Sequence, residues 1–235
     1  MPAFFGMTTR MLRAIASPGR VIAMATVGVI GIVIGVVVER SDPGPEFAVD
    51  FLSQFGLLIY VPLVVLVIST ATLGTLVEEK TLVYFWMRPI GRWQIAVAAL
   101  LAGLLVLVPL ILVPMGILAA VVGDSTDISG MLVASLVGIA GYTSVFTFLG
   151  LVTQRALAWG LGYILIWEGF VAGLSRSAGW LALRTYTTSA LSDITDSIGP
   201  ISNPASSTTV FVVTAGVVLA GLLLTTWRLN AADVD

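Results

Sequence analysis

The stretch FLSQFGLLIYVPLVVLVISTATLGTLV, from Phe51 to Val77, decides the fold class of this chain, because it contains no acidic or basic residue. A helix needs about 20 apolar residues to cross the hydrocarbon core of a membrane. This run is longer than that requirement. It therefore predicts a transmembrane helix whose far end projects out of the bilayer.

The composition of the whole chain agrees with a membrane protein. Of its 235 residues, 58% are hydrophobic and 10% are charged, whereas a soluble domain carries about 25% charged residues. The chain has no Cys and no His, which excludes disulfides, thiol nucleophiles, histidine-dependent zinc sites and Ser-His catalytic pairs. It also has no Gly-rich phosphate loop. We therefore expect a protein that is not an enzyme by itself and holds no metal or cofactor of its own.

Six segments are apolar and long enough to cross a membrane, so we predict an all-α membrane protein with a single transmembrane domain, 1–235. The predicted spans are 21–38, 51–77, 95–122, 129–152, 156–174 and 208–227. The first run ends in Glu39 and Arg40 without a cleavage pattern, which favours a retained span over a signal peptide. Residues 1–19 predict an amphipathic helix at the membrane interface, with a disordered basic tail as the alternative.

The basic residues indicate the orientation of these spans. With the N-terminus inside, eight Lys and Arg residues lie on the inner side and three on the outer side, as the positive-inside rule requires. The inner residues are Arg10, Arg13, Arg20, Lys80, Arg88, Arg92, Arg155 and Arg228. We therefore expect a multi-pass protein of the cell membrane with both termini in the cytoplasm.

The connector between the second and third spans, 78–93, differs from a simple hairpin. It reads EEKTLVYFWMRPIGRW. Thr81 can cap a short helix, and Pro89 would end it. Phe85 and Trp86 add apolar surface to this cytoplasmic element, which suits a docking site for another protein. Alternatively, the aromatic residues lie at the membrane interface, as belts of Trp and Tyr do.

This connector resembles the cytoplasmic coupling segment of ABC-2 type transporter permeases, the membrane-spanning subunits of ATP-binding cassette exporters. That segment has an acidic pair, a Thr, an apolar turn and an Arg-Pro pair. The chain also ends as these permeases do, with Trp227 and Arg228 followed by Ala-Asp-Val. It departs from them at Lys80, where many members carry Gly.

The resemblance implies a set of partners. Two ABC-type ATPase subunits, which bind ATP and Mg, would receive the coupling segment, and a second permease subunit, identical or paralogous, would complete the transporter. Membrane lipid is the other expected partner; nucleic acid is not. The residues predicted to couple to the ATPase are Glu78, Glu79, Thr81, Phe85, Trp86, Arg88, Pro89 and Arg92.

Glu168 lies well inside the fifth predicted span. A charged side chain there is costly, so it should face a partner group or a water-filled cavity. It either lines the transport route or a gate, or it makes a packing contact. The following segment, 175–207, predicts amphipathic helices in the outer leaflet, which the resemblance implies act as an external gate. Trp180 and Tyr186 in this segment are therefore assigned with Glu168 to the route or gate; a plain surface cap is the alternative.

Two pairs of glycines have the G-x-x-x-G spacing that lets helices approach closely. They are Gly31 with Gly35 in the first span and Gly169 with Gly173 in the fifth. The resemblance implies that two permease subunits meet through these spans, so we predict the four glycines at a dimer interface. Packing within one subunit is the alternative.

These features together predict the permease subunit of an ATP-driven exporter that moves an apolar or amphipathic substrate, such as a lipid or drug. The alternative is a stand-alone secondary transporter or channel. Ion-coupled carriers usually hold several ionisable residues within the membrane, and here Glu168 is the clear one. Pro62, Pro109 and Pro114 interrupt predicted spans, where they predict kinks.

Overall fold

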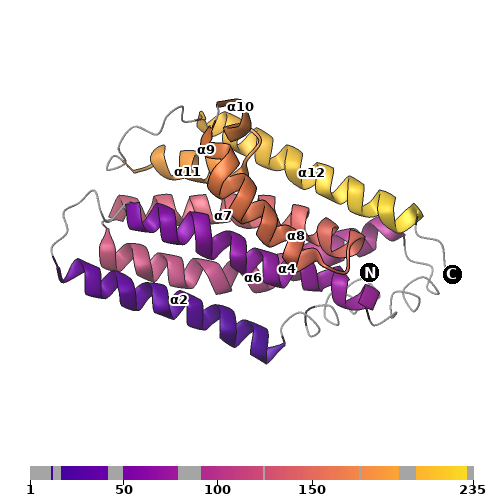
Figure 1. Ribbon diagram of the computed structural model, residues 1–235, viewed down its shortest axis with the longest axis horizontal. Coiled ribbons are helices and arrows are strands. Elements are labelled where there is room, and N and C mark those ends of the chain that lie inside the picture. The colour runs from indigo at the N-terminus through magenta and orange to yellow at the C-terminus, as the bar shows by residue number, and fades with distance from the viewer. Residues whose placement is uncertain are drawn as a thin grey trace.

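The structure is a computed structural model that describes residues 12, 17–41, 50–78, 91–123, 125–174, 176–195 and 205–231. The described part is helical and contains no strand (Figure 1). Its elements are the α-helices α2 (Pro18–Glu39), α4 (Val61–Glu78), α6 (Arg92–Val122), α7 (Ser125–Val152), α8 (Ala156–Gly162), α9 (Ala172–Leu174), α10 (Arg176–Gly179), α11 (Leu183–Ser192) and α12 (Ser207–Ala231), and the π-helices η1 (Leu52–Tyr60) and η2 (Tyr163–Val171).

Five helices of the described part are long and apolar enough to cross a membrane, which indicates a membrane protein. They are Pro18–Glu39, Leu52–Thr75, Arg92–Val122, Ser125–Val152 and Ser207–Ala231. Each coincides with a predicted span. Leu52–Thr75 lies within its predicted bounds, 51–77, and each of the other four begins before its predicted first residue. The fifth predicted span, 156–174, is divided among α8, η2 and α9, and its apolar part, Ala156–Val171, is shorter than a full span.

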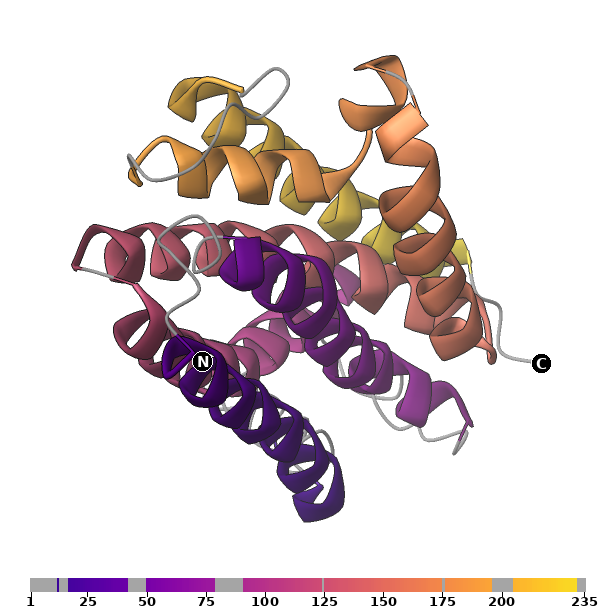
Figure 2. The same cartoon turned by 60° about the vertical axis from the view of Figure 1, so that its left-hand side comes forward.

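Helix α7 lies at the centre of the bundle and packs against α4, α6, α11 and α12. Helix α2 lies on α6 at one side, and α8 with η2 lies against α4 and α7 at the other (Figure 2). The contact between α4 and α7 is so close that a Cβ added to Gly150 would overlap the Thr70 carbonyl. Only glycine fits there, because the two backbones touch directly.

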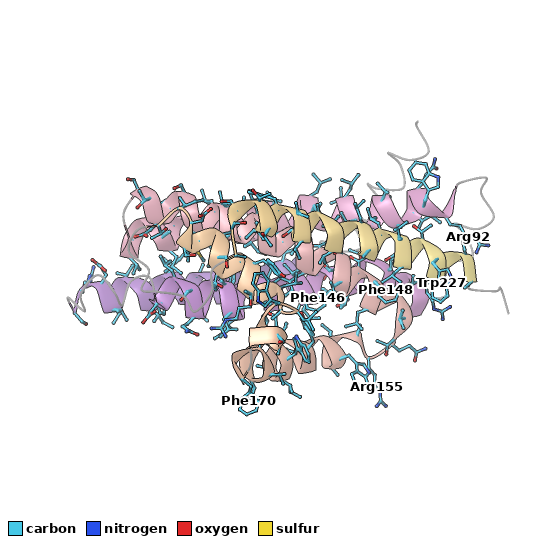
Figure 3. All side chains as sticks on the ribbon, turned by 90° about the horizontal axis from the view of Figure 1, so that it is seen from above. Arg92, Phe146, Phe148, Arg155, Phe170 and Trp227 are labelled. Carbon is cyan, nitrogen blue, oxygen red and sulfur yellow. The ribbon has the colours of Figure 1, made fainter. Side chains whose placement is uncertain are left out.

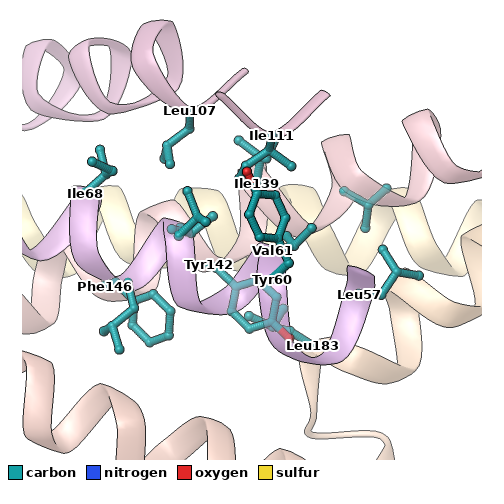
Figure 4. Close-up of a cluster of buried hydrophobic side chains, with 14 of the residues drawn as sticks. Leu57, Tyr60, Val61, Ile68, Leu107, Ile111, Ile139, Tyr142, Phe146 and Leu183 are labelled. Atoms are coloured by element: carbon teal, nitrogen blue, oxygen red, sulfur yellow. The ribbon is translucent and has the colours of Figure 1, made fainter. Parts of the chain in front are cut away.

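The core between these helices is apolar (Figure 4). One polar contact within it supplies a hydrogen-bond donor to a carbonyl of α6 that has no helical partner. Pro114 has no N–H, so the Leu110 carbonyl lacks its helical donor. The Tyr60 hydroxyl donates to that carbonyl at 2.9 Å. A Cβ on Gly28 would lie 2.7 Å from the Tyr60 oxygen, so α2, η1 and α6 meet at this point.

One end of the bundle gathers basic residues. Helices α4, α7 and α12 end there, and α2, α6 and α8 begin there (Figure 1). The arginines of the described part at this end are Arg20, Arg92, Arg155 and Arg228. Figure 3 shows Arg92 and Trp227 at this end of the bundle, and the Arg92 guanidinium donates to the Leu229 carbonyl. This contact ties the start of α6 to the end of α12.

Several sequence predictions fall outside the described residues. They concern most of the interfacial helix, 1–19, and most of the coupling segment, 78–93. In the predicted outer segment, 175–207, the structure has α10 and α11, with α12 starting at its end. The depth of α10 and α11 in a membrane stays a prediction.

Candidate functional site

The candidate site is built around Glu168, whose side chain is 0% exposed. Its carboxylate accepts three hydrogen bonds from three different elements. The Tyr142 hydroxyl of α7 donates to Oε2. The Tyr163 hydroxyl, from the start of η2, donates to Oε1 at 3.0 Å, and the Leu183 N–H of α11 donates to the same oxygen at 3.1 Å. The burial of this acidic side chain is therefore offset by donors, as a buried carboxylate requires.

Aromatic packing fixes the two tyrosines that hold the carboxylate. The Tyr142 ring stacks on Phe146 with ring centroids 5.7 Å apart, and Phe146 meets the edge of Tyr163 at 6.3 Å. Tyr142 and Phe146 belong to the buried cluster shown in Figure 4. Both hydroxyls are thus aimed at Glu168 by rings that have little freedom to turn.

Helix α11 receives its N-terminal cap from Glu168. The residue at the capping position, Ala182, makes no side-chain cap, so the first N–H groups of α11 need an outside acceptor. The carboxylate of Glu168 supplies it at the Leu183 N–H, where the positive end of the helix dipole also favours a negative charge. The Arg184 guanidinium donates to the Glu168 backbone carbonyl at 3.5 Å.

The other two residues predicted for the route or gate, Trp180 and Tyr186, lie beside each other. The Tyr186 hydroxyl donates to the Trp180 carbonyl at 2.7 Å, and the rings meet edge to face with centroids 6.4 Å apart. Burial raises the pKa of the Tyr186 phenol above its ordinary value. Trp180 lies in the turn that leads into the end of α11 that Glu168 caps, and Tyr186 lies in the first turn of α11 itself.

Sequence reasoning did not find Tyr142, Tyr163 or the Leu183 N–H. Tyr142 follows a run of small and apolar residues in α7, where an isolated phenol is a recognisable signal for a polar contact. Tyr163 lies five residues before Glu168, a spacing that does not bring two side chains together in an α-helix. Its contact depends on the π-helical form of η2, which no sequence pattern indicated.

The glycines assigned to a dimer interface separate into two groups. A Cβ on Gly31 would overlap the Phe55 ring, and one on Gly35 would lie 2.6 Å from Leu118. The alternative of packing within one chain therefore accounts for both. Gly169 is exposed, its nearest neighbour being the Ile164 carbonyl at 3.5 Å from an added Cβ, and Gly173 lies in α9. A contact between two subunits at η2 stays a prediction.

Two residues of the predicted coupling set lie in the described part. Glu78 is the last residue of α4, and Arg92 is the first residue of α6. Arg92 binds the Leu229 carbonyl within the same chain, so it has a structural role whether or not a partner docks nearby. The remaining residues of the set lie outside the described residues: Glu79, Thr81, Phe85, Trp86, Arg88 and Pro89.

No other site in the described part competes chemically with the Glu168 cluster. Among the described residues, no group of three His, Cys, Asp or Glu side chains could hold a metal ion. Four buried hydroxyls of α4 and α7 have no hydrogen-bond partner within the described structure: Ser69, Ser135, Thr143 and Thr147. They add polarity between these helices, but they contain no charge.

Comparison with known proteins adds no family assignment. Neither a scan against protein-family models nor a search of the curated proteins gives a match to this chain.

Proposed function

We propose that this chain is the permease subunit of an ATP-driven ABC exporter. The observation that carries the proposal is the segment EEKTLVYFWMRPIGRW, which joins the end of α4 to the start of α6. Both ends of this segment, Glu78 and Arg92, lie at the end of the bundle where the described arginines gather. A cytoplasmic position for that end follows from the positive-inside rule.

The packing of the bundle supports a mechanical role for this segment. Helices α4 and α6 continue directly from it, and both pack against α7. Two ATPase subunits that bind ATP and Mg would close on each other and displace the segment, which Phe85 and Trp86 anchor in the partner. Because helices packed this closely move as rigid units, a displacement at the segment would reach the opposite end of the bundle.

The proposal extends to the complete transporter. A second permease subunit, identical or paralogous, would place two bundles side by side in the cell membrane, with both termini of each in the cytoplasm. The cargo would be apolar or amphipathic, such as a lipid or a drug. The Glu168 cluster, with Trp180 and Tyr186, would belong to the outer gate of this route.

A stand-alone secondary transporter is the second candidate, and one observation favours it. Glu168 is a fully buried carboxylate in an apolar helix, and such residues often mark ion or proton pathways. Its three donors come from this chain, however, and among the described residues no second acidic group binds it. Transport that persists without any ATPase would decide for this candidate.

The test of the exporter proposal replaces Phe85 and Trp86 with Ala and measures co-purification of the ATPase. We expect the variant to insert normally and to lose the ATPase. Trp93→Ala is the matched control, because Trp93 is the last residue of the segment, is not among the predicted coupling residues, lies in α6 and is 58% exposed. Full ATPase binding by the Phe85 and Trp86 variant would refute docking through this segment.

A further inference from the structure

The polar contacts of Glu168 join η2, α7 and α11. Helix α11 has only ten residues, and a helix this short is not stable without tertiary contacts. Its contact with α7 is close: an added Cβ on Gly138 would lie 3.2 Å from Thr187, and one on Gly141 would lie 3.1 Å from Leu183. These glycines have no side chain that could make a directional bond to α11.

Glu168 supplies that directional bond. It is anchored to α7 through Tyr142 and to the start of α11 through the Leu183 N–H. We infer that Glu168, held by Tyr142 and Tyr163, is a latch that fixes α11 on α7, and that the π-helical form of η2 closes it. The Glu168 latch is defined by these three side chains and the Leu183 N–H.

The π-helix matters because of the spacing between Tyr163 and Glu168. In an α-helix, residues five apart point about 140° away from each other, at 3.6 residues per turn. In a π-helix, the backbone bond joins residues five apart, so their side chains lie over one another on successive turns. The bond of 3.0 Å between Tyr163 and Glu168 is therefore available in the π form and lost in the α form.

The latch defines one conformation of α11, which lies in the predicted outer segment, 175–207. With Glu168 bound, α11 is capped and lies on α7, as in this structure. Without the bond, α11 loses its cap, and its buried face becomes accessible. On the proposed function, which this step presupposes, the closed latch corresponds to a closed outer gate. Tyr142 and Tyr163 are then positioning residues that act through Glu168.

The latch itself can be tested without any transport assay. Because the chain has no Cys, Ala190→Cys introduces a single reporter on the buried face of α11, where Ala190 is 6% exposed. The full-length protein in lipid nanodiscs is treated with a water-soluble maleimide. Ala134→Cys is the matched reporter, because Ala134 is buried in α7 and becomes reactive only when the bundle unfolds.

We expect Glu168→Gln to accelerate labelling at position 190 about tenfold, the factor that corresponds to loss of one hydrogen bond to a charged group, and to leave position 134 unreactive. Tyr142→Phe and Tyr163→Phe should act in the same direction. Tyr60→Phe is the control, since the Tyr60 hydroxyl binds a carbonyl of α6. Unchanged labelling at position 190 in Glu168→Gln would overturn the latch. If Glu168→Gln opens both reporters, the milder Tyr163→Phe variant decides by the same criterion.

The π-helical part of the inference has its own test. In a double-mutant cycle, Tyr163→Phe and Glu168→Gln should together accelerate labelling no more than the stronger single change, because both remove the same bond. If the acceleration in the double variant equals the product of the two single accelerations, the two side chains do not interact. That result would overturn the role of the π-helix.

A reversible lock separates the latch from the proposed function. A Cβ on Gly130 would lie 2.7 Å from the Thr195 hydroxyl oxygen, so cysteines at positions 130 and 195 should form a disulfide that holds the end of α11 on α7. Oxidation should stop transport while the ATPase still co-purifies, and reduction should restore transport. Full transport by the oxidised protein would overturn the gate role of α11. Absence of a co-purifying ATPase would instead refute the exporter proposal and leave the labelling result standing.

Discussion

The two π-helices of this protein have the same length and opposite surroundings. Four residues of η1 are buried, including Leu57 and Tyr60, whereas η2 buries Ile164 and Glu168 and exposes most of the rest. In η1, Tyr60 donates to a carbonyl that Pro114 has left without a partner. In η2, Tyr163 donates to a carboxylate. The same irregular backbone therefore positions a tyrosine hydroxyl for a backbone carbonyl in one place and for a buried carboxyl group in the other.

The largest loss of stability should come from removing the carboxyl group of Glu168. Glu168→Leu leaves the hydroxyls of Tyr142 and Tyr163 and the Leu183 N–H without their acceptor, and each unpaired buried group costs about 1–3 kcal/mol. We expect the free energy of unfolding to fall by about 3 kcal/mol or more, with loss of stable assembly. Titration with a denaturing detergent measures it. Glu168→Gln keeps an acceptor oxygen and should be much milder; equal losses for Leu and Gln would contradict the hydrogen-bonding account.

A smaller loss of stability is expected from substituting glycines at the two π-helices. Gly31 of α2 packs against η1, and Gly169 belongs to η2. Gly31→Ala places a methyl group in the Phe55 ring of η1, and overpacking of this kind costs about 1–3 kcal/mol. Gly169→Ala in η2 meets only an ordinary van der Waals contact, with the Ile164 carbonyl at 3.5 Å, and should leave the stability of one chain unchanged. Both variants are compared by thermal unfolding. Equal destabilisation would show that η2 is as enclosed as η1.

The Gly169 variant also sharpens the dimer prediction. If two permease subunits meet at η2, a bulky Gly169→Leu change should weaken the dimer while the single chain stays folded. Mass photometry of the protein in nanodiscs reads the oligomeric state directly. A dimer that persists unchanged would move the interface away from Gly169.

The smallest loss of stability is expected from removing the hydroxyl of Tyr60. Tyr60→Phe leaves the Leu110 carbonyl unpaired, at a cost of about 1 kcal/mol. Since the Tyr60 hydroxyl donates to a carbonyl of α6 and not to the Glu168 carboxylate, we expect a modest loss of thermal stability and no change in labelling at position 190. Faster labelling at that position would show that the two π-helical regions are coupled.

The contrast between these regions also explains what the sequence could and could not predict. Apolar runs such as Phe51–Val77 predicted six membrane spans, because length and hydropathy are sufficient for that inference, and five of them are membrane-length helices in the described part. The cost of a charge among apolar residues predicted that Glu168 faces a partner group or a water-filled cavity. Its partners were not predictable, because Tyr142 comes from another helix and Tyr163 reaches it only through the π form of η2. The packing of Gly31 and Gly35 within the chain likewise depends on the three-dimensional position of Phe55 and Leu118.

The central claim is that this bundle works through a separate ATPase, and the most direct measurement is isolation of the native complex in mild detergent. We expect the chain to co-purify with an ABC-type ATPase and to carry ATP hydrolysis with it. Replacement of Phe85 and Trp86 with Ala should remove both the partner and the hydrolysis. A chain that is purified intact, transports its substrate and has no nucleotide-binding partner would contradict the account.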